Sequence, residues 1–420
     1  MKLHEWVPLV PIARGSGPWL MDFNGNRYLD AVSSWWVNLF GHANPRINDA
    51  IRDQLQKLEH VILAGFTHEP VVQLSERLAR IAPRGLGHCF YASDGSSAVE
   101  IALKMSFHYW RNAGHPEKSA FSSLASGYHG ETLGALAVGD VPLFKETYAP
   151  LLLRTAQVAS PDSRRAEPGE SGEAFALRCA EALERHLEAR HRETAALLLE
   201  PLVQCAGGMA MYHPAYLRRA RELCSRYDVH LIADEIAVGF GRTGTMFACE
   251  QANIAPDFLC LSKGLSAGYL PLSVTLTTDA VYGAFWDDEV ARGFLHSHSY
   301  TGNPLACRAA LASLDIFEQD GVLEANARRT RELTQRAAPI RHHPRVRYFR
   351  NTGMIWAFDV DTADPQFPRK VFREALKHEL LLRPLGNTVY FMPPYVIESE
   401  EAELLVAGTL RTLDAVLAAA

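Results

Sequence analysis

The stretch His230-Leu-Ile-Ala-Asp-Glu-Ile236 is an apolar run that ends in two carboxylates, and it decides the expected fold. A second apolar run, Phe258-Leu-Cys-Leu-Ser262, follows after one intervening segment and leads to Lys263 and Gly264. Short apolar runs of this kind are typical of strands that are buried on both faces of a sheet. In open α/β sheets, ligands bind where the strands end. We therefore expect Asp234 and Lys263 at neighbouring strand ends.

Carboxylates and a lysine in this layout are expected in a pyridoxal phosphate enzyme. The lysine forms an imine with the cofactor, and an aspartate keeps the pyridine nitrogen protonated so that the ring accepts electrons. Side chains alternate along a strand, so only one of Asp234 and Glu235 can face the cofactor, and we assign Asp234. Desolvation would lower the pKa of Lys263 and free its amine. Taken singly, Asp234 could instead cap a helix or form an ion pair, and Lys263 could emerge into solvent.

The alternation of short apolar runs with helical patterns between residues 87 and 304 indicates an α/β sheet covered by helices on both faces. A hairpin is predicted around Asn24-Gly25-Asn26, and a helix from Pro45. We predict a large domain over residues 61–305, with a mixed, mostly parallel sheet between helices. A smaller α+β domain would combine residues 1–60 and 306–420. The strand candidates of the large domain are 88–92, 195–200, 230–234, 258–262 and 272–276, and its helix candidates include 96–110 and 214–227.

Composition narrows the class of protein. The 420 residues carry a formal net charge of −6, which gives no case for a nucleic-acid partner. The seven cysteines form no C-x-x-C pair and predict reduced thiols of a cytosolic enzyme. No uncharged apolar run is long enough to span a membrane, and Met1–Trp6 has no signal-peptide core.

Two further motifs suit a phosphorylated planar ligand. Asp94-Gly95-Ser96-Ser97 precedes a predicted helix, whose N-terminal N–H groups and dipole favour phosphate, although for this motif alone an ordinary helix cap is the more frequent explanation. Gly127-Tyr128-His-Gly130 places an aromatic ring between glycines, which suits stacking on a flat cofactor. A packed loop tyrosine is the plainer alternative.

Two motifs have competing interpretations. Gly239-Phe-Gly-Arg-Thr-Gly244 matches a dinucleotide-binding string, but Asp234 and Glu235 already occupy the strand end and no helix start follows, so we interpret it as a loop. The segment His296-Ser-His-Ser299 lacks further metal ligands, so we expect it to complete a phosphate site and predict no metal.

Substrate-pocket candidates lie nearer the termini. Ser33-Ser-Trp-Trp36 contains adjacent tryptophans, which are seldom both core residues. Arg383 could hold a carboxylate in a bidentate contact, with Tyr390 beside it.

Together these motifs resemble the class III, fold-type I aminotransferases over almost the whole chain. The most specific residues are Leu231–Gly244, Pro256-Asp257 and Ser262-Lys263-Gly264 with Gly268. Within the class, the chain resembles the branch of biotin biosynthesis that uses S-adenosylmethionine to aminate 8-amino-7-oxononanoate. That likeness rests on Ser33–Trp36, Gly127–Gly130, Glu200–Met209, Met211–Pro214, Arg383–Gly386 and Tyr390–Tyr395.

The resemblance implies a role for each candidate. Lys263 bonds the cofactor and moves the proton, Asp234 pairs with the pyridine nitrogen, and Tyr128 stacks on the ring. The phosphate contacts are Gly95 and Ser96, helped by His298 and Ser299 of a partner subunit in a homodimer with shared active sites. The substrate contacts are Trp35, Tyr128, Lys263, Ser297, Arg383 and Tyr390.

The sequence departs from the family near its start. Relatives carry a Trp-His-Pro-Tyr-type segment that supplies a tyrosine to the substrate pocket, and Met1–Leu9 contains none. A translation start further upstream and a pocket open on that side are the two alternatives. Relatives that act on ornithine or 4-aminobutyrate have a second glutamate at the position of Cys205, which argues against those donors. The remaining alternatives are lysine as the donor, an ω-amino acid:pyruvate transaminase, a nucleotide-dependent oxidoreductase and a pseudoenzyme.

Overall fold

The computed structural model describes residues 5, 7 and 9–418, and the chain divides into two compact units. Unit 1 comprises Met1–Ala50 and Leu314–Ala420, and unit 2 comprises Ile51–Ser313. The domain boundaries expected after residues 60 and 305 stay a prediction. The expectation about a signal core at Met1–Trp6 falls, apart from Glu5, outside the described residues.

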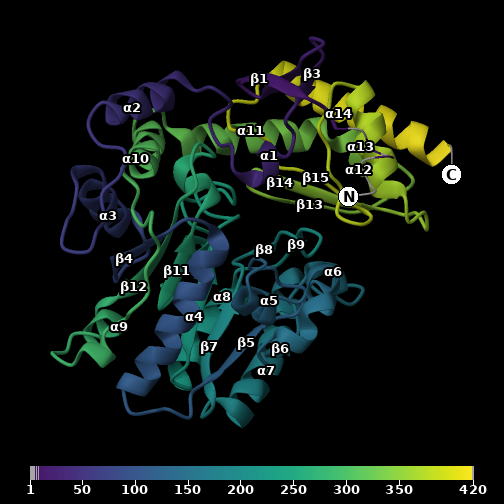
Figure 1. Ribbon diagram of the computed structural model, residues 1–420. Helices are drawn as coiled ribbons and strands as arrows, with labels where there is room; N and C mark the ends of the chain where they lie inside the picture. Colours follow the sequence, from purple (N-terminus) through teal and green to yellow (C-terminus); the bar gives the residue numbers. More distant parts are fainter. Residues whose placement is uncertain (1–4, 6, 8, 419–420) are drawn as a thin grey trace. The chain divides into compact units, whose positions relative to one another are not determined.

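Unit 2 is built on a seven-stranded sheet with the order β4-β12-β11-β10-β7-β5-β6 (Figure 1). β10 is parallel to β11 and β7, and β5 is parallel to β7 and β6, whereas β12 is antiparallel to both β11 and β4. The predicted mixed, mostly parallel sheet is therefore confirmed. The strands are β4 Leu86–Ala92, β5 Ala120–Leu124, β6 Ala156–Val158, β7 Thr194–Leu199, β10 His230–Asp234, β11 Phe258–Leu261 and β12 Ser273–Thr278.

The core of unit 2 lies between this sheet and its helices. Every residue of β7, β10 and β11 is buried, as expected for strands covered on both faces. Half of the residues of helix α4 (Gly95–Asn112) are buried, and the apolar ones among them pack in one core cluster with Leu198, Ile232 and Phe258. The remaining elements of unit 2 are α3 Glu69–Ile81, α5 Leu133–Val138, α6 Pro142–Lys145, α7 Gly172–Arg190, α8 Ala215–Arg226, α9 Asp279–Gly283, η2 Glu146–Leu151, η3 Ser163–Arg165, η4 Ala248–Ala252, η5 Lys263–Ser266, η6 Val290–Arg292 and the strand pair β8 Val203–Gln204 and β9 Ala210–Met211.

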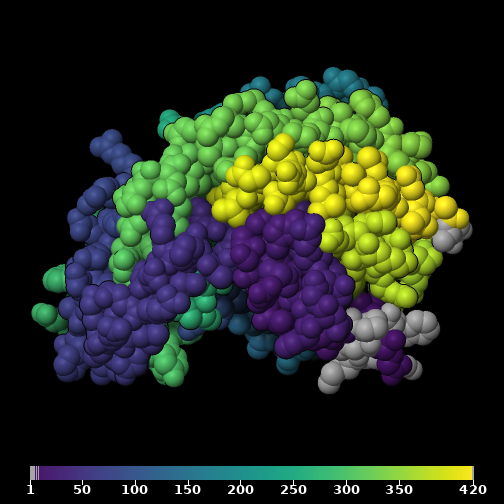
Figure 2. All heavy atoms as spheres, turned by 90° about the horizontal axis from the view of Figure 1, so that it is seen from above, coloured from purple at the N-terminus to yellow at the C-terminus, as the bar shows by residue number. Residues whose placement is uncertain are grey.

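Unit 1 joins the two ends of the chain. The predicted hairpin is present, with Gly25 in a left-handed conformation (φ 86°) that favours glycine. Leu29 donates its N–H to Glu379 O (2.7 Å) and accepts from Leu381 N (2.9 Å), and Trp19 Nε1 donates to Glu401 (3.3 Å). Figure 2 shows a purple N-terminal segment against a yellow C-terminal segment. The predicted α+β domain built from both termini is confirmed.

The elements of unit 1 form two antiparallel three-stranded sheets and their covering helices. α2 (Pro45–Leu55) and α10 (Pro304–Gln319) contain the boundaries between the units. In the described chain, no helix combines the length and the apolar character that crossing a membrane requires. The elements are β1 Ile12–Ser16, β2 Trp19–Asp22, β3 Arg27–Leu29, α1 Ser33–Trp36, α11 Val322–Arg336, α12 Ala338–Arg341, β13 Val346–Thr352, β14 Ile355–Val360, α13 Phe367–Lys377, β15 Thr388–Phe391 and α14 Ser399–Ala418.

Candidate active site

The carboxyl ends of four adjacent parallel strands in unit 2 carry one buried polar cluster. Lys263 follows β11, Asp234 ends β10, Glu200 follows β7, and His129 lies in the loop after β5. Neighbouring strand ends bring these groups together although they are far apart in sequence. This is the edge at which ligands of α/β sheets bind.

Asp234 is held in place by its own hydrogen bonds. The residue is 4 % exposed, and its carboxylate accepts from His129 Nδ1 (2.8 Å) and from the backbone N–H of Ile236 (3.1 Å). Glu235 is fully buried and accepts instead from the N–H groups of Ala248 (2.7 Å) and Cys249 (2.8 Å) in η4. The two neighbouring carboxylates thus serve different partners, and Asp234 is the one that belongs to the cluster.

Lys263 has a strained backbone conformation and a lowered pKa. Its φ of 43° lies in the left-handed region that non-glycine residues avoid, and such strain collects at functional sites. The side chain is half-buried, and desolvation of the amine lowers the pKa of Lys263, while Asp234, Cys205 and Glu200 act in the opposite direction. A lysine with a lowered pKa more readily presents a neutral amine for nucleophilic attack.

Glu200 and His129 belong to this cluster, although the motifs did not assign them a role. Glu200 is 5 % exposed and accepts from the N–H groups of Tyr128 (3.0 Å) and Cys205 (2.9 Å). His129 is 3 % exposed and its Nε2 has no hydrogen-bond partner within the described chain. The sequence did carry a signal for Glu200, because it ends an apolar run just as Asp234 does.

The N-terminus of α4 forms a second part of the site. Asp94 caps the helix by accepting from Ser97 N (2.9 Å), which leaves the N–H groups of Gly95 and Ser96 without an acceptor among the described residues. A Cβ on Gly95 would lie 2.9 Å from Ile236 Cγ2, so the close approach to the end of β10 requires glycine. Ser96 Oγ also lies 2.7 Å from Thr132 Oγ1. Free N–H groups and hydroxyls at a helix N-terminus suit a phosphate.

Tyr128 is connected to the cluster through its backbone. Its hydroxyl donates to Glu131 (3.0 Å), its ring is tilted against Phe144 at 5.5 Å, and its N–H binds Glu200. Burial and the nearby carboxylates raise the pKa of the phenol, so it stays neutral. Stacking of this ring on a ligand stays a prediction.

The segment with Ser297, His298 and Ser299 is not connected to the Lys263 cluster by hydrogen bonds or ion pairs within the described residues. His298 contacts His296 (Nε2–Nε2 3.1 Å), whose Nδ1 lies 2.8 Å from Lys104 Nζ, and both serines are exposed. A role for these residues in the site of a second subunit stays a prediction.

The predicted substrate contacts of unit 1 take part in one cation–π pair, Arg383 with Trp35, and one aromatic pair, Tyr390 with Trp36. The exposed Arg383 places its guanidinium 5.0 Å from the centre of the Trp35 ring and 5.7 Å from that of Phe372. Trp36 is buried and donates from Nε1 to the hydroxyl of buried Tyr390 (3.0 Å). The hydroxyl of Tyr390 thus holds the Trp36 ring in place. A direct contact of Tyr390 with substrate stays a prediction.

Backbone strain accompanies these pairs. All four residues from Ser33 to Trp36 have positive φ values, between 45° and 73°, which cost non-glycine residues energy. Buried Asp30 stabilises the segment by accepting from Ser34 N (2.8 Å) and Ser34 Oγ (2.7 Å). The strained turn separates the directions of the two rings, so that Trp36 is buried and Trp35 is 58 % exposed.

Comparisons with known proteins agree with this geometry. The model of the family described as aminotransferase class III matches residues 2–413. The adenosylmethionine-8-amino-7-oxononanoate aminotransferases of Helicobacter pylori and Geobacter sulfurreducens are 47 % and 43 % identical, over 99 % of this chain and 94 % of each relative.

This chain belongs to the class III aminotransferases. Solved structures agree. The adenosylmethionine-8-amino-7-oxononanoate aminotransferase of Methanocaldococcus jannaschii has a TM-score of 0.93 at 33 % identity, covering 99 % of this chain and 95 % of its own. An ω-transaminase of Pseudomonas jessenii has a TM-score of 0.94 at 30 % identity with the same coverage.

The observed residues fit the pyridoxal phosphate on which class III aminotransferases depend. Asp234 offers a buried, fixed carboxylate for a pyridinium nitrogen, Lys263 an amine of lowered pKa for the aldehyde, and Gly95 and Ser96 offer N–H groups for the phosphate. The Gly239–Gly244 string forms turns and no helix begins within it. Membership of the class III aminotransferases contradicts the alternative of a nucleotide-dependent oxidoreductase.

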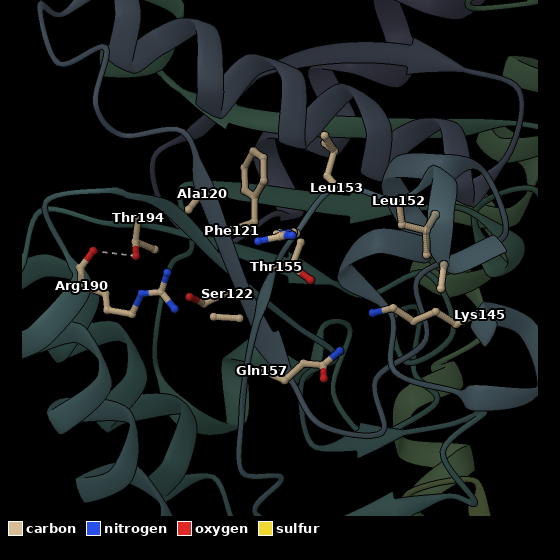
Figure 3. Close-up of a pocket in the computed structure, with 13 residues that line it drawn as sticks. Ala120, Phe121, Ser122, Lys145, Leu152, Leu153, Thr155, Gln157, Arg190 and Thr194 are labelled. Carbon is tan, nitrogen blue, oxygen red and sulfur yellow. Dashed lines mark hydrogen bonds between the residues drawn. The ribbon is translucent and has the colours of Figure 1, made fainter. Parts of the chain in front are cut away.

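The cavity shown in Figure 3 is separate from this class III site. It measures about 460 Å³ and lies near the amino ends of β5, β6 and β7, with Arg190 and Lys145 extending into it from opposite sides. Arg190 binds Glu193 (2.6 Å), and Lys145 donates to Gly139 O (2.7 Å). With no carboxylate in its lining, the cavity could not pair with a pyridinium.

Proposed function

We propose that this chain transfers an amino group from S-adenosylmethionine to 8-amino-7-oxononanoate, giving 7,8-diaminononanoate for biotin biosynthesis. The Lys263–Asp234 pair at the carboxyl edge of the sheet carries the transaminase chemistry. The choice of substrates is supported by relatives of that name at up to 47 % identity along nearly the whole chain.

In this proposal the bound cofactor supplies an electron sink, and the protein positions groups around it. Asp234, whose orientation His129 and Ile236 N–H fix, would hold the ring nitrogen of the cofactor. The amine of Lys263 would hold the aldehyde group and could accept and return a proton. Gly95 and Ser96 would hold the phosphate, and Tyr128 would cover the ring.

Substrate choice would depend on residues outside this cluster. Arg383 would bind the carboxylate of the oxo acid, beside the flat apolar wall of Trp35. Ser297 and Tyr390 complete the proposed substrate contacts. Cys205 is fully buried at the position of the relatives' second glutamate, so no carboxylate there can neutralise an arginine when a terminal amine enters. Ornithine-type donors should therefore react poorly.

The proposed homodimer is supported by an apolar surface on unit 2. Segments 59–68 and 296–303 lie side by side, since His68 Nε2 contacts Gly302 O (2.8 Å) and Asn303 donates to Glu59 O (3.0 Å). Their exposed side chains include Ile62, Phe66 and Tyr300, each more than half exposed. A second copy of the chain would cover these side chains and receive His298 and Ser299 at its phosphate site.

Mixing two inactive variants tests the shared site. A Lys263→Ala protomer and a His298→Ala/Ser299→Ala protomer would together restore one complete site per heterodimer if residues 298 and 299 serve the partner. Unrestored activity after confirmed subunit exchange would show that each protomer uses its own segment. The cytoplasm is the proposed compartment, and cell fractionation would check it.

The donor is tested by spectroscopy of the cofactor-loaded protein. S-adenosylmethionine should change the absorbance of the bound cofactor, and subsequent 8-amino-7-oxononanoate should restore it with formation of the diamine, identified by mass spectrometry. If lysine changes the absorbance and S-adenosylmethionine does not, the chain belongs with the lysine-using members of the same branch. The second candidate function is that of an ω-amino acid:pyruvate transaminase, favoured by the TM-score of 0.94 to the ω-transaminase. Rapid reaction with an ω-amino acid and pyruvate would support it.

A further inference from the structure

We propose that Glu200 is a positioning residue of the cofactor site: one buried carboxylate fixes the backbone of Tyr128 and of Cys205 beside the His129–Asp234 pair. The inference deepens the proposed function and rests on it. Glu200 contacts no reacting atom in this proposal, and it acts through the loops that it holds.

The hydrogen bonds require a carboxylate in its ionised form. Oε1 accepts from Tyr128 N at 3.0 Å and Oε2 accepts from Cys205 N at 2.9 Å, so both oxygens face a donor. An ionised carboxylate offers two acceptors, whereas an amide would turn an NH₂ group toward one of the two N–H groups. A buried donor without an acceptor is costly, so one of the two loops would lose its attachment.

The surroundings of Glu200 oppose its charge. Burial raises the pKa of Glu200 to about 7, and Asp234 also raises it, while His129 and the two backbone hydrogen bonds lower it. The carboxylate therefore binds both loops fully only above neutral pH. The titratable groups that face it are His129, Asp234, Lys263, Cys205, Tyr128 and Tyr212.

Protonation of Glu200 should therefore weaken cofactor binding. Lys263 and Asp234 are the two groups proposed to touch the cofactor. The negative charge of Glu200 stabilises the charged form of Lys263 and repels the negative charge of Asp234. Bringing a pyridinium to Asp234 adds a positive charge to this buried cluster and favours the ionised form of Glu200. Cofactor affinity and Glu200 ionisation should thus rise together.

Glu235 provides a matched control in the same unit. It is fully buried, accepts from two backbone N–H groups (Ala248 and Cys249) at 2.7 and 2.8 Å, and burial raises its pKa to about 7 as well. Its partners belong to η4 and not to the loops of Tyr128 and Cys205. A Glu235→Gln variant therefore carries the same chemical change with no direct effect on those loops.

The experiment measures binding of pyridoxamine phosphate to the cofactor-free protein by calorimetry between pH 5.5 and 8.5. This probe cannot bond covalently to Lys263, and its phosphate titrates identically in every variant. The ratio of the Kd of Glu200→Gln to that of the wild type should be about tenfold at pH 8.5, the size of one charged hydrogen bond, and approach one near pH 5.5. The ratio for Glu235→Gln should stay near one throughout.

Two results would overturn the proposal. A ratio for Glu200→Gln that does not change with pH, or an equal ratio for Glu235→Gln, would show a merely structural glutamate. If Glu200→Gln does not fold, the wild type is compared with Glu235→Gln instead. Glu200 titrates in both of these proteins, so both must show the same rise in affinity for the probe around neutral pH. Failure of the wild type to bind the probe at all would overturn the proposed function together with this inference.

Discussion

Two lysines at opposite ends of the same sheet show how one residue type serves structure or chemistry. Lys118, at the amino ends of β5, β7 and β10, is 4 % exposed and donates to the carbonyl oxygens of His191 (2.9 Å), Thr194 (3.3 Å) and Asp228 (2.6 Å). Its Nζ also lies 4.5 Å from the centre of the Trp110 ring. Lys263, at the carboxyl ends, faces ionisable groups from a strained backbone.

The difference lies in the neighbours and not in burial alone. Desolvation lowers the pKa of both lysines. The three donors of the Lys118 ammonium all have carbonyl acceptors, which fixes the charged form as a cross-link. Around Lys263 the neighbours are the ionisable side chains of Asp234, Cys205 and Glu200 instead of backbone carbonyl groups, and they act against the desolvation that lowers the pKa of the amine.

The largest effect should come from removing the reactive lysine. Lys263→Ala should lower turnover by at least about 10⁴-fold, as expected for the loss of a covalent catalyst. Borohydride reduction of the wild-type protein with cofactor should label the peptide that contains Lys263 and not the one that contains Lys118. A label at Lys118, measured by mass spectrometry, would reverse the comparison.

Asp234→Asn should cost about 3–4 kcal/mol of transition-state stabilisation, the range for removal of one preorganised electrostatic partner. The shape is kept and only the charge next to the ring nitrogen is lost. Rapid-mixing measurement of each half-reaction checks this value. Asp257, which binds Arg221 and Leu231 N at the amino end of the sheet, is the control, and Asp257→Asn should change stability and leave the half-reactions near normal.

Lys118→Met should lower the free energy of unfolding by about 2–3 kcal/mol, because the hydrogen bonds of a buried ammonium to three carbonyl groups are lost. The control is the surface lysine Lys57, whose side chain is 60 % exposed and pairs with that of Asp53, which is 55 % exposed. Lys57→Met should change the free energy of unfolding by less than about 0.5 kcal/mol. Urea denaturation of the cofactor-free variants measures both. An unchanged midpoint with lost turnover would mean that Lys118 acts in the reaction.

The sequence predicted the Lys263 end of the sheet better than the Lys118 end. Asp234 and Lys263 each follow a continuous apolar run, so these runs alone predicted both residues at the sheet edge. Lys118 lies in a polar segment, and its acceptors are 73 to 110 positions away, which no local pattern reveals. His129 was missed as a member of the cluster for the same reason, since it meets Asp234 across 105 positions. Glu200 ends an apolar run as Asp234 does, but the motifs gave it no role.

A third cation, Arg383, extends the comparison to a charge that is neither cross-linked nor buried. It is exposed and lies over Trp35 and Phe372, so its guanidinium keeps donors available for an incoming carboxylate. Arg383→Ala should weaken binding of 8-amino-7-oxononanoate by about 1.5 kcal/mol, the lower end for a charged hydrogen bond because solvent screens the exposed group.

The donor half-reaction separates recognition of the oxo acid from general damage. Arg383→Lys keeps the charge but loses the planar fork, so it should recover only part of the affinity. S-adenosylmethionine should reduce the bound-cofactor absorbance at nearly the wild-type rate in both variants. Equal losses in the two half-reactions, measured by stopped flow, would mean that Arg383 supports the fold around Trp35 and that the carboxylate is bound by another residue.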